Sequence, residues 1–142
     1  MARITIDLPD AFQFSTELDV RISDINYGNH LGNDAVLSLL HEARVRFLMA
    51  HGFSEQDVAG CGLIMADAAV VYKSQGRYGQ RLRVSIAVSE PGAVGCDLLY
   101  QMCDAATGAE VARAKTGMVF FDYARGKVVR MPEAFKALCP QP

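Results

Sequence analysis

Residues 20–51 read VRISDINYGNHLGNDAVLSLLHEARVRFLMAH, and the pattern of this stretch changes from loop to helix near its middle. Residues 24–32 are rich in Asp, Asn and Gly, which tolerate turn and left-handed backbone conformations, so they predict a loop. After Asn33, apolar residues recur at intervals of three or four, which is typical of a helix with one buried face. The recurring residues are Ala35, Leu39, Leu40, Ala43, Phe47 and Ala50. We therefore expect a helix from about residue 33 to residue 51, with Asn33 as its N-cap.

The segments on either side of this helix predict strands. Alternation and β-branched residues indicate strands over 14–23, 63–74, 81–89, 94–103 and 111–122, a short strand near 127–130, and a terminal helix beginning at Pro132. The segment 63–74 is too apolar for a strand with one exposed face, so we expect its second face to be covered in places. This order predicts an α+β fold in which residues 1–142 form one domain and a single helix packs on a curved antiparallel sheet of five to six strands.

Composition limits the classes of function. The chain has 142 residues, of which 51% are apolar and 21% are charged, with a net charge of -2. These values match a compact globular protein and argue against a nucleic-acid partner. No apolar run approaches the roughly 20 residues that span a bilayer, and the N-terminus lacks the pattern of a signal peptide. We therefore expect a cytoplasmic protein without a membrane partner.

The sequence shows no pattern for metal or redox chemistry. Its 4 cysteines are widely spaced and form no CxxC pair, and its 3 histidines are scattered, so neither a metal site nor a cofactor is expected. The cysteines are interpreted as small buried apolar residues at Cys61, Cys96, Cys103 and Cys139.

The segment 20–33 resembles the signature of 4-hydroxybenzoyl-CoA-type and acyl-carrier thioesterases, which have the hotdog fold. In that family the loop reads roughly Asp-x-Asp-x-x-Gly-His-x-Asn-Asn, and the helix after it commonly carries Glu-Glu-Ala-Arg, matched here by His41-Glu42-Ala43-Arg44. The resemblance extends over residues 14–130. It implies a hotdog fold, in which the sheet wraps one long central helix, and hydrolysis of an acyl-CoA or acyl-carrier-protein thioester.

The loop departs from the family pattern at three places. The second Asp of the motif, which acts in many members as nucleophile or as base, falls on Asn26. A neutral amide has no basic lone pair to offer a water molecule, so ordinary carboxylate catalysis is not expected there. The paired Gly-His of the family is Asn29-His30 here, and the first of its two asparagines is Gly32.

Thioester hydrolysis needs donors for the carbonyl oxygen as it becomes an oxyanion, together with a group that delivers water. The start of a helix offers unpaired backbone N–H groups and a positive dipole end, so the amides of residues 31–33 are candidate donors, with Asn33 at the tip. His30 is a candidate to donate to the thioester carbonyl or to orient Asn26. An equally good interpretation is that His30 fixes the loop through backbone hydrogen bonds.

Some related hotdog thioesterases place the acid in the middle of the helix and an amide on the loop, and Asn26 fits that arrangement. The mid-helix position then falls on His41 or Glu42. These residues lie about 12 to 14 Å along the helix axis from Asn33, whereas reacting atoms must approach within about 3.5 Å. We therefore expect a site at a dimer interface, in a homodimer or a tetramer of dimers, with the base supplied by the neighbouring chain. The alternative is that Glu42 forms a surface pair with Arg46 and that His41 is simply exposed.

Coenzyme A would enter as part of the substrate, and three basic residues are candidates to contact its phosphates: Lys73, Arg77 and Lys115. A solvated strand edge explains them equally well. Asp24 is interpreted as a residue that holds the loop. Asp67 lies inside an apolar strand, where a buried acid would need a partner or a raised pKa, so it is an outside candidate for catalysis.

Three functions remain open from the sequence, and thioester hydrolysis to a free acid and a thiol is the one we favour. The second is non-catalytic binding of an acyl group or CoA, which the missing Asp supports. The third is an enoyl-CoA hydratase-like activity, because Asp24-Ile25-Asn26 with His30 resembles the Asp-x-Asn-Pro-x-His loop of the hotdog hydratases. That resemblance is superficial, since the spacing is one residue too long and no Pro follows Asn26.

Overall fold

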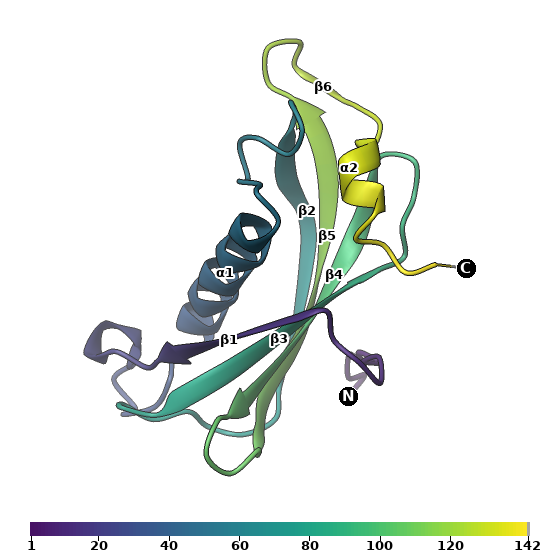
Figure 1. Ribbon diagram of the computed structural model, residues 1–142. Helices are drawn as coiled ribbons and strands as arrows, with labels where there is room; N and C mark the ends of the chain where they lie inside the picture. The colour runs from purple at the N-terminus through teal and green to yellow at the C-terminus, as the bar shows by residue number, and fades with distance from the viewer. Residues whose placement is uncertain (142) are drawn as a thin grey trace.

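A six-stranded antiparallel sheet curves around one long helix in the computed structural model, which describes residues 1–141 (Figure 1). The strands lie in the order β1-β3-β4-β5-β2, and β6 pairs with β5 off this path. The elements are β1 (Phe14–Asp19), a short 3-10 helix (Ile22–Asp24), α1 (Asn33–Ala50), β2 (Gly62–Tyr72), β3 (Arg81–Ser89), β4 (Gly95–Asp104), β5 (Glu110–Asp122), β6 (Lys127–Val128) and α2 (Glu133–Lys136). This arrangement confirms the predicted α+β class.

Most element boundaries fall within two residues of the predicted ones, with one exception. Strand β1 ends at Asp19 and not at residue 23, because the carboxylate of Asp24 accepts a hydrogen bond from the Arg21 backbone N–H at 2.8 Å and turns the chain into the 3-10 helix. The predicted N-cap is also wrong. Gly32 occupies that position, no side chain caps the helix, and Asn33 is the first helical residue.

The buried face of α1 packs on the inner face of the sheet and forms the core. Ala43 and Phe47 of the helix have no exposed surface. The centroid of the Phe47 ring lies 5.7 Å from that of Phe14, the first residue of β1. The sheet residues that cover the core alternate along β3 and β4: Leu82, Val84, Ile86, Leu98, Tyr100 and Met102. Of the cysteines, only Cys96 is buried, whereas Cys61, Cys103 and Cys139 are partly exposed. This packing fixes the rotation of α1 about its own axis.

Strand β2 lies at an edge of the sheet and has β5 as its sole neighbour among the described residues. Its register with β5 shifts between Met65 and Asp67, so Ala66 is an extra residue in a β-bulge. Residues 65–68 are exposed. The expected cover of the second face of this segment is therefore missing at residues 65–68.

The side chain of Asp67 is exposed, and the interpretation of this residue as a buried acid is wrong. Its Oδ1 accepts hydrogen bonds from the Lys115 ammonium at 2.7 Å and from the Gly117 backbone N–H at 2.9 Å. These two hydrogen bonds, the first being the larger effect, lower the pKa of Asp67 below its ordinary value. Asp67 is thus a fixed anion on the sheet surface.

The loop that leads into α1 is held by the buried residue Asp24. The Arg21 guanidinium donates to both carboxylate oxygens of Asp24, and the Asp24 carbonyl accepts a hydrogen bond from the Gly32 amide at 2.9 Å. Burial acts to raise the pKa of Asp24, but the hydrogen bonds from Arg21 outweigh it and hold the pKa below its ordinary value of 3.8. The structural role expected for Asp24 agrees with these contacts.

We predict that Asp24→Asn removes a pH-dependent part of the stability. Because the pKa of Asp24 is lower in the folded state than in the unfolded chain, its ionised form stabilises the fold at neutral pH, and this contribution disappears as pH falls through the folded pKa. The free energy of unfolding should therefore differ most between wild type and variant near pH 7, and the difference should shrink below about pH 4. Urea titrations across this range measure it.

The matched control is Asp10→Asn, which removes a carboxylate at an exposed position before β1 and should leave the stability almost unchanged at every pH. A difference between wild type and Asp24→Asn that stays constant with pH would contradict the role of the charge.

Candidate active site

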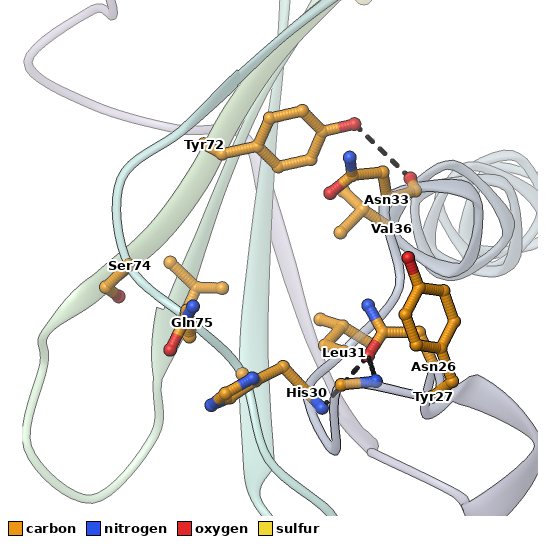
Figure 2. Close-up of a pocket in the computed structure, with 12 residues that line it drawn as sticks. Asn26, Tyr27, His30, Leu31, Asn33, Val36, Tyr72, Ser74 and Gln75 are labelled. Atoms are coloured by element: carbon orange, nitrogen blue, oxygen red, sulfur yellow. Dashed lines mark hydrogen bonds between the residues drawn. The ribbon is translucent and has the colours of Figure 1, made fainter.

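A cavity of about 390 Å³ opens at the N-terminal tip of α1 (Figure 2). The loop before the helix forms one wall, the first turn of the helix forms a second, and the end of β2 with the segment after it forms a third. The Tyr72 hydroxyl donates to the Asn33 carbonyl at 3.3 Å and so ties the end of β2 to the helix tip. The structure brings Asn26, His30 and Asn33 together around this cavity.

The side chain of Asn26 uses its oxygen to hold the loop. Asn26 Oδ1 accepts hydrogen bonds from the backbone N–H groups of Gly28 at 2.9 Å and His30 at 3.2 Å. The amide nitrogen, Nδ2, is left free of the loop backbone, and Figure 2 shows it on the side facing Asn33. Asn26 therefore presents a hydrogen-bond donor to the cavity, whereas an aspartate there would present an anion.

The imidazole of His30 extends away from the Asn26 side chain, as Figure 2 shows. The two residues contact each other through the loop backbone instead, because the Asn26 backbone N–H donates to the His30 carbonyl at 2.8 Å. His30 thus lines the cavity and contributes to the loop geometry through its backbone, while its ring does not orient Asn26.

The helix tip has fewer free amides than the sequence suggested. The Leu31 amide donates to the Gly76 carbonyl at 2.9 Å, and the Gly32 amide donates to the Asp24 carbonyl at 2.9 Å. These two candidate oxyanion donors are therefore already used by the fold. Within residues 1–141, the amides of the first turn that have no acceptor are those of Asn33, Asp34 and Ala35. They leave a cluster of unpaired N–H groups at the positive end of the helix dipole.

His41 and Glu42 lie on different sides of α1. His41 lines a second cavity of about 230 Å³, together with Leu37 and with Met65 of the free edge strand β2. Glu42 lies toward β1, where its carboxylate accepts a hydrogen bond from Arg46 at 3.0 Å. The surface pair considered from the sequence is thus present in the structure, and His41 alone of the two faces the free edge.

Sequence reasoning missed Glu55, which contacts the middle of α1 from the segment between the helix and β2. Its Oε1 lies 2.5 Å from Nε2 of His41, and its Oε2 accepts a hydrogen bond from Arg44 Nε at 3.0 Å. No motif signals this residue, because it lies 14 positions from His41 in a loop. Only the return of the chain from α1 to β2 brings the two side chains together.

The three basic residues differ in their surroundings. Lys115 is held between two carboxylates, Asp67 at 2.7 Å and Asp97 at 3.2 Å, on the sheet face opposite to α1. Arg77 lines a cavity of about 490 Å³ that shares residues with the helix-tip cavity, and Lys73 is exposed directly after β2. Lys73 and Arg77 therefore lie near the helix-tip cavity, whereas Lys115 is engaged elsewhere.

The described part of the chain contains no group of three or more His, Cys, Asp or Glu side chains that could hold a metal ion. Across residues 1–141, no helix has the length and apolar character required to cross a bilayer.

Comparisons with known proteins agree with this fold. A 1,4-dihydroxy-2-naphthoyl-CoA thioesterase from Synechocystis has a TM-score of 0.80 at 22% identity, covering 88% of this chain and 93% of its own. The gentisyl-coenzyme A thioesterase BH1999 has a TM-score of 0.77 at 15% identity, covering 87% of this chain and 99% of its own. The protein SAV2348 from Staphylococcus aureus, solved in complex with CoA, has a TM-score of 0.80 at 16% identity, covering 96% of this chain and 92% of its own.

These identities are low, so the three structures support the hotdog fold alone. A search of curated proteins gives no match. The family model described as the thioesterase-like superfamily matches residues 20–138, which is most of the chain and includes the loop, α1 and all strands after it. The chain therefore belongs to the thioesterase-like superfamily.

Proposed function

We propose that the protein hydrolyses an acyl-CoA or acyl-carrier-protein thioester to a free acid and a thiol, at a site shared by two chains. The observation that carries this proposal is the helix-tip cavity, which is lined by Asn26 and by Asn33, a first-turn residue whose backbone amide is unpaired. Membership of the thioesterase-like superfamily supports the reaction class. The relatives solved as CoA thioesterases, and the one solved with CoA, support the substrate class.

The donors at the helix tip suit the oxygen of a thioester carbonyl. As water attacks the carbonyl carbon, negative charge develops on that oxygen, and fixed donors in a partly enclosed site stabilise it. The Asn33 amide and Nδ2 of Asn26 are held by the fold, since the Asn26 oxygen is anchored by two loop amides. The donors therefore need little reorganisation when the charge forms.

The proposed base is His41, supplied by a second copy of the chain. Within one chain, His41 lies about 12 Å along the helix axis from Asn33, which is too far for a shared reaction centre. His41 lies on the side of α1 that faces the free edge of β2. A base in this position is accessible to a neighbouring chain that pairs along the same edge.

The free edge of β2 supports a homodimer. It is an 11-residue strand with unpaired backbone groups and an exposed apolar middle, which is a ready surface for pairing with another strand. Two copies related by a two-fold axis would pair these edges antiparallel. Because α1 runs antiparallel to β2, with Asn33 at Tyr72 and His41 near Met65, the two helices would then run in opposite senses beside the joint edge. A tetramer of dimers would leave this pairing unchanged.

The proposed reaction follows from these groups. His41 of one chain accepts a proton from water, and the oxygen of that water forms a bond to the thioester carbon at the helix tip of the other chain. The resulting tetrahedral oxyanion collapses, the carbon–sulfur bond breaks, and the proton held by His41 passes to the leaving thiolate. Lys73 and Arg77 are proposed to contact the phosphates of CoA, whereas Lys115 is already neutralised by two carboxylates.

We predict that the purified protein releases free thiol from at least one member of a panel of short, long and aromatic acyl-CoA substrates. His41→Ala should lower kcat at least about tenfold, because it removes the proton acceptor. Glu42→Ala should stay within about twofold of wild type, because Glu42 pairs with Arg46 on the other side of α1. Thiol release measured with a colorimetric reagent checks both variants.

Full activity in His41→Ala would remove the mid-helix base from the mechanism. Binding of acyl-CoA without release of thiol would instead support the non-catalytic alternative, which the Asn at position 26 favours.

We predict that Asn26→Asp lowers kcat at least about tenfold. The aspartate keeps an acceptor oxygen for the Gly28 and His30 amides but replaces the Nδ2 donor with a negative charge beside the developing oxyanion. The matched control is Asn29→Asp, which adds the same charge to an exposed position of the same loop, where the left-handed backbone suits Asp. A raised rate in Asn26→Asp would show that this loop works through a carboxylate and would end the donor role of Asn26.

The shared site makes a further prediction about mixed dimers. In a dimer of one His41→Ala chain and one Asn26→Asp chain, one site combines an intact loop with an intact His41, and the other site carries both defects. Random mixing of equal amounts by co-expression should therefore restore about a quarter of wild-type activity. Activity no higher than that of the separate variants would place both groups in the same chain.

A further inference from the structure

Glu55 is held at three points, two on its carboxylate and one on its backbone. Its Oε1 lies 2.5 Å from His41 Nε2, its Oε2 accepts from Arg44 Nε at 3.0 Å, and its backbone carbonyl accepts from the Leu63 amide at 2.8 Å. The Leu63 amide belongs to β2, so the backbone of Glu55 is attached to the sheet. The carboxylate therefore bridges two side chains of the helix, with Oε2 at Arg44 and Oε1 at His41.

A series of hydrogen bonds between buried side chains connects Glu55 to the sheet. Arg44 is 6% exposed, and its Nη1 donates to the Tyr100 hydroxyl oxygen at 3.2 Å. The Tyr100 hydroxyl is hydrogen-bonded in turn to Thr116 at 2.7 Å, and both of these residues are buried in the sheet. The position of Arg44, and with it that of Oε2 of Glu55, is thus set by strands β4 and β5.

Glu55 is ionised at neutral pH. Burial acts to raise the pKa of Glu55, but the hydrogen bonds from His41 and Arg44 outweigh it and lower the pKa below its ordinary value of 4.5. An ionised carboxylate only accepts hydrogen bonds, so it binds the protonated nitrogen of a neutral imidazole. The proton of neutral His41 is thereby placed on Nε2, and Nδ1 is left with a free lone pair.

We propose that Glu55 is a positioning residue for His41, holding the proton on Nε2 and leaving Nδ1 as the proton acceptor. The inference rests on the proposed role of His41 as the base. An imidazole that is 54% exposed, as His41 is, would otherwise exchange between rotamers and between its two neutral tautomers. The contact with Glu55 removes this freedom in the same way that a buried carboxylate orients the histidine of a catalytic triad.

A role for Glu55 as the counter-charge of Arg44 does not account for the geometry. Arg44 takes one oxygen, Oε2, and the hydrogen bond that it makes is complete without Oε1. The second oxygen is directed at His41, whose ring borders the cavity beside the free edge of β2. Glu55 thus serves both side chains, and the two roles can be separated by experiment.

The variant Glu55→Gln separates them because glutamine has one acceptor oxygen where glutamate has two. The Arg44 guanidinium can only donate hydrogen bonds, so it takes the remaining oxygen. The amide NH₂ group then faces His41 and donates to Nε2. This contact moves the proton of the neutral imidazole to Nδ1 and removes the proposed acceptor.

The first measurement is steady-state kinetics on the intact protein with the best acyl-CoA substrate of the panel. We expect Glu55→Gln to lower kcat at least about tenfold with KM within about twofold, because the tautomer is wrong but the helix-tip cavity is unchanged. Glu55→Asp keeps both oxygens on a shorter side chain and should recover at least about threefold over Glu55→Gln. The matched control is Glu133→Gln, which alters an exposed surface pair with Lys136 and should match wild type.

The second measurement does not depend on activity. The chain has 3 histidines, so ¹⁵N-labelled histidine gives a simple spectrum in which His41 is assigned from its loss in His41→Gln. Long-range ¹H–¹⁵N correlations should show neutral His41 protonated on Nε2 in wild type and in Glu55→Asp, and on Nδ1 in Glu55→Gln. These spectra test the positioning role even if the protein hydrolyses no member of the panel. A lack of hydrolysis would count against the proposed function and would leave the positioning role to be decided by the spectra.

An unchanged tautomer in Glu55→Gln would overturn the proposal, and so would a reversed tautomer with an unchanged kcat. Urea titrations of each variant complete the test, since equal losses of stability in Glu55→Gln and Glu55→Asp with equal losses of kcat would assign Glu55 to the fold alone.

Discussion

The packing of α1 against the sheet sets the position of every group at the candidate site. Ala43 and Phe47 have no exposed surface, and their burial fixes the helix at one rotation about its axis. Successive helical residues are about 100° apart, so this rotation directs His41 toward the free edge of β2 and Glu42 toward β1. The same packing places the helix tip against the end of β2, where Tyr72 bonds to Asn33 and closes one wall of the cavity.

The shape of the loop before α1 is compatible with either an asparagine or an aspartate at position 26, but the chemistry of the two side chains differs. The oxygen of Asn26 holds the loop amides as an aspartate oxygen could, so the turn itself does not require a carboxylate. The other side-chain atom differs, because Nδ2 donates where a carboxylate oxygen accepts. The proposed stabilisation of an oxyanion uses this donor, and the proposal assigns the acceptance of a proton to another residue. The proposal assigns this task to His41, which borders the cavity beside the free edge of β2.

The polar network beneath α1 connects the sheet to that histidine. Buried polar groups are costly unless their hydrogen bonds are satisfied, and every buried side-chain nitrogen and oxygen in the described residues has a partner. A continuous series of side-chain hydrogen bonds leads from the sheet to the exposed imidazole of His41. Its members are Thr116, Tyr100, Arg44 and Glu55. Such a series of hydrogen bonds restricts the position of a side chain on the surface. A catalytic base needs a defined position of this kind.

The sequence alone determined the α+β order of elements, the helix from residue 33, the loop before it and the neutral amide at position 26. These features depend on neighbours in the chain, because periodicity, turn-forming residues and side-chain chemistry act over a few positions. Only the tertiary structure decided that the Leu31 and Gly32 amides are occupied, that Lys115 is held by two carboxylates, and that Glu55 contacts His41. Most of these contacts join residues that are distant in sequence, and they form only when the strands pair in the sheet and the chain returns from the helix to the sheet.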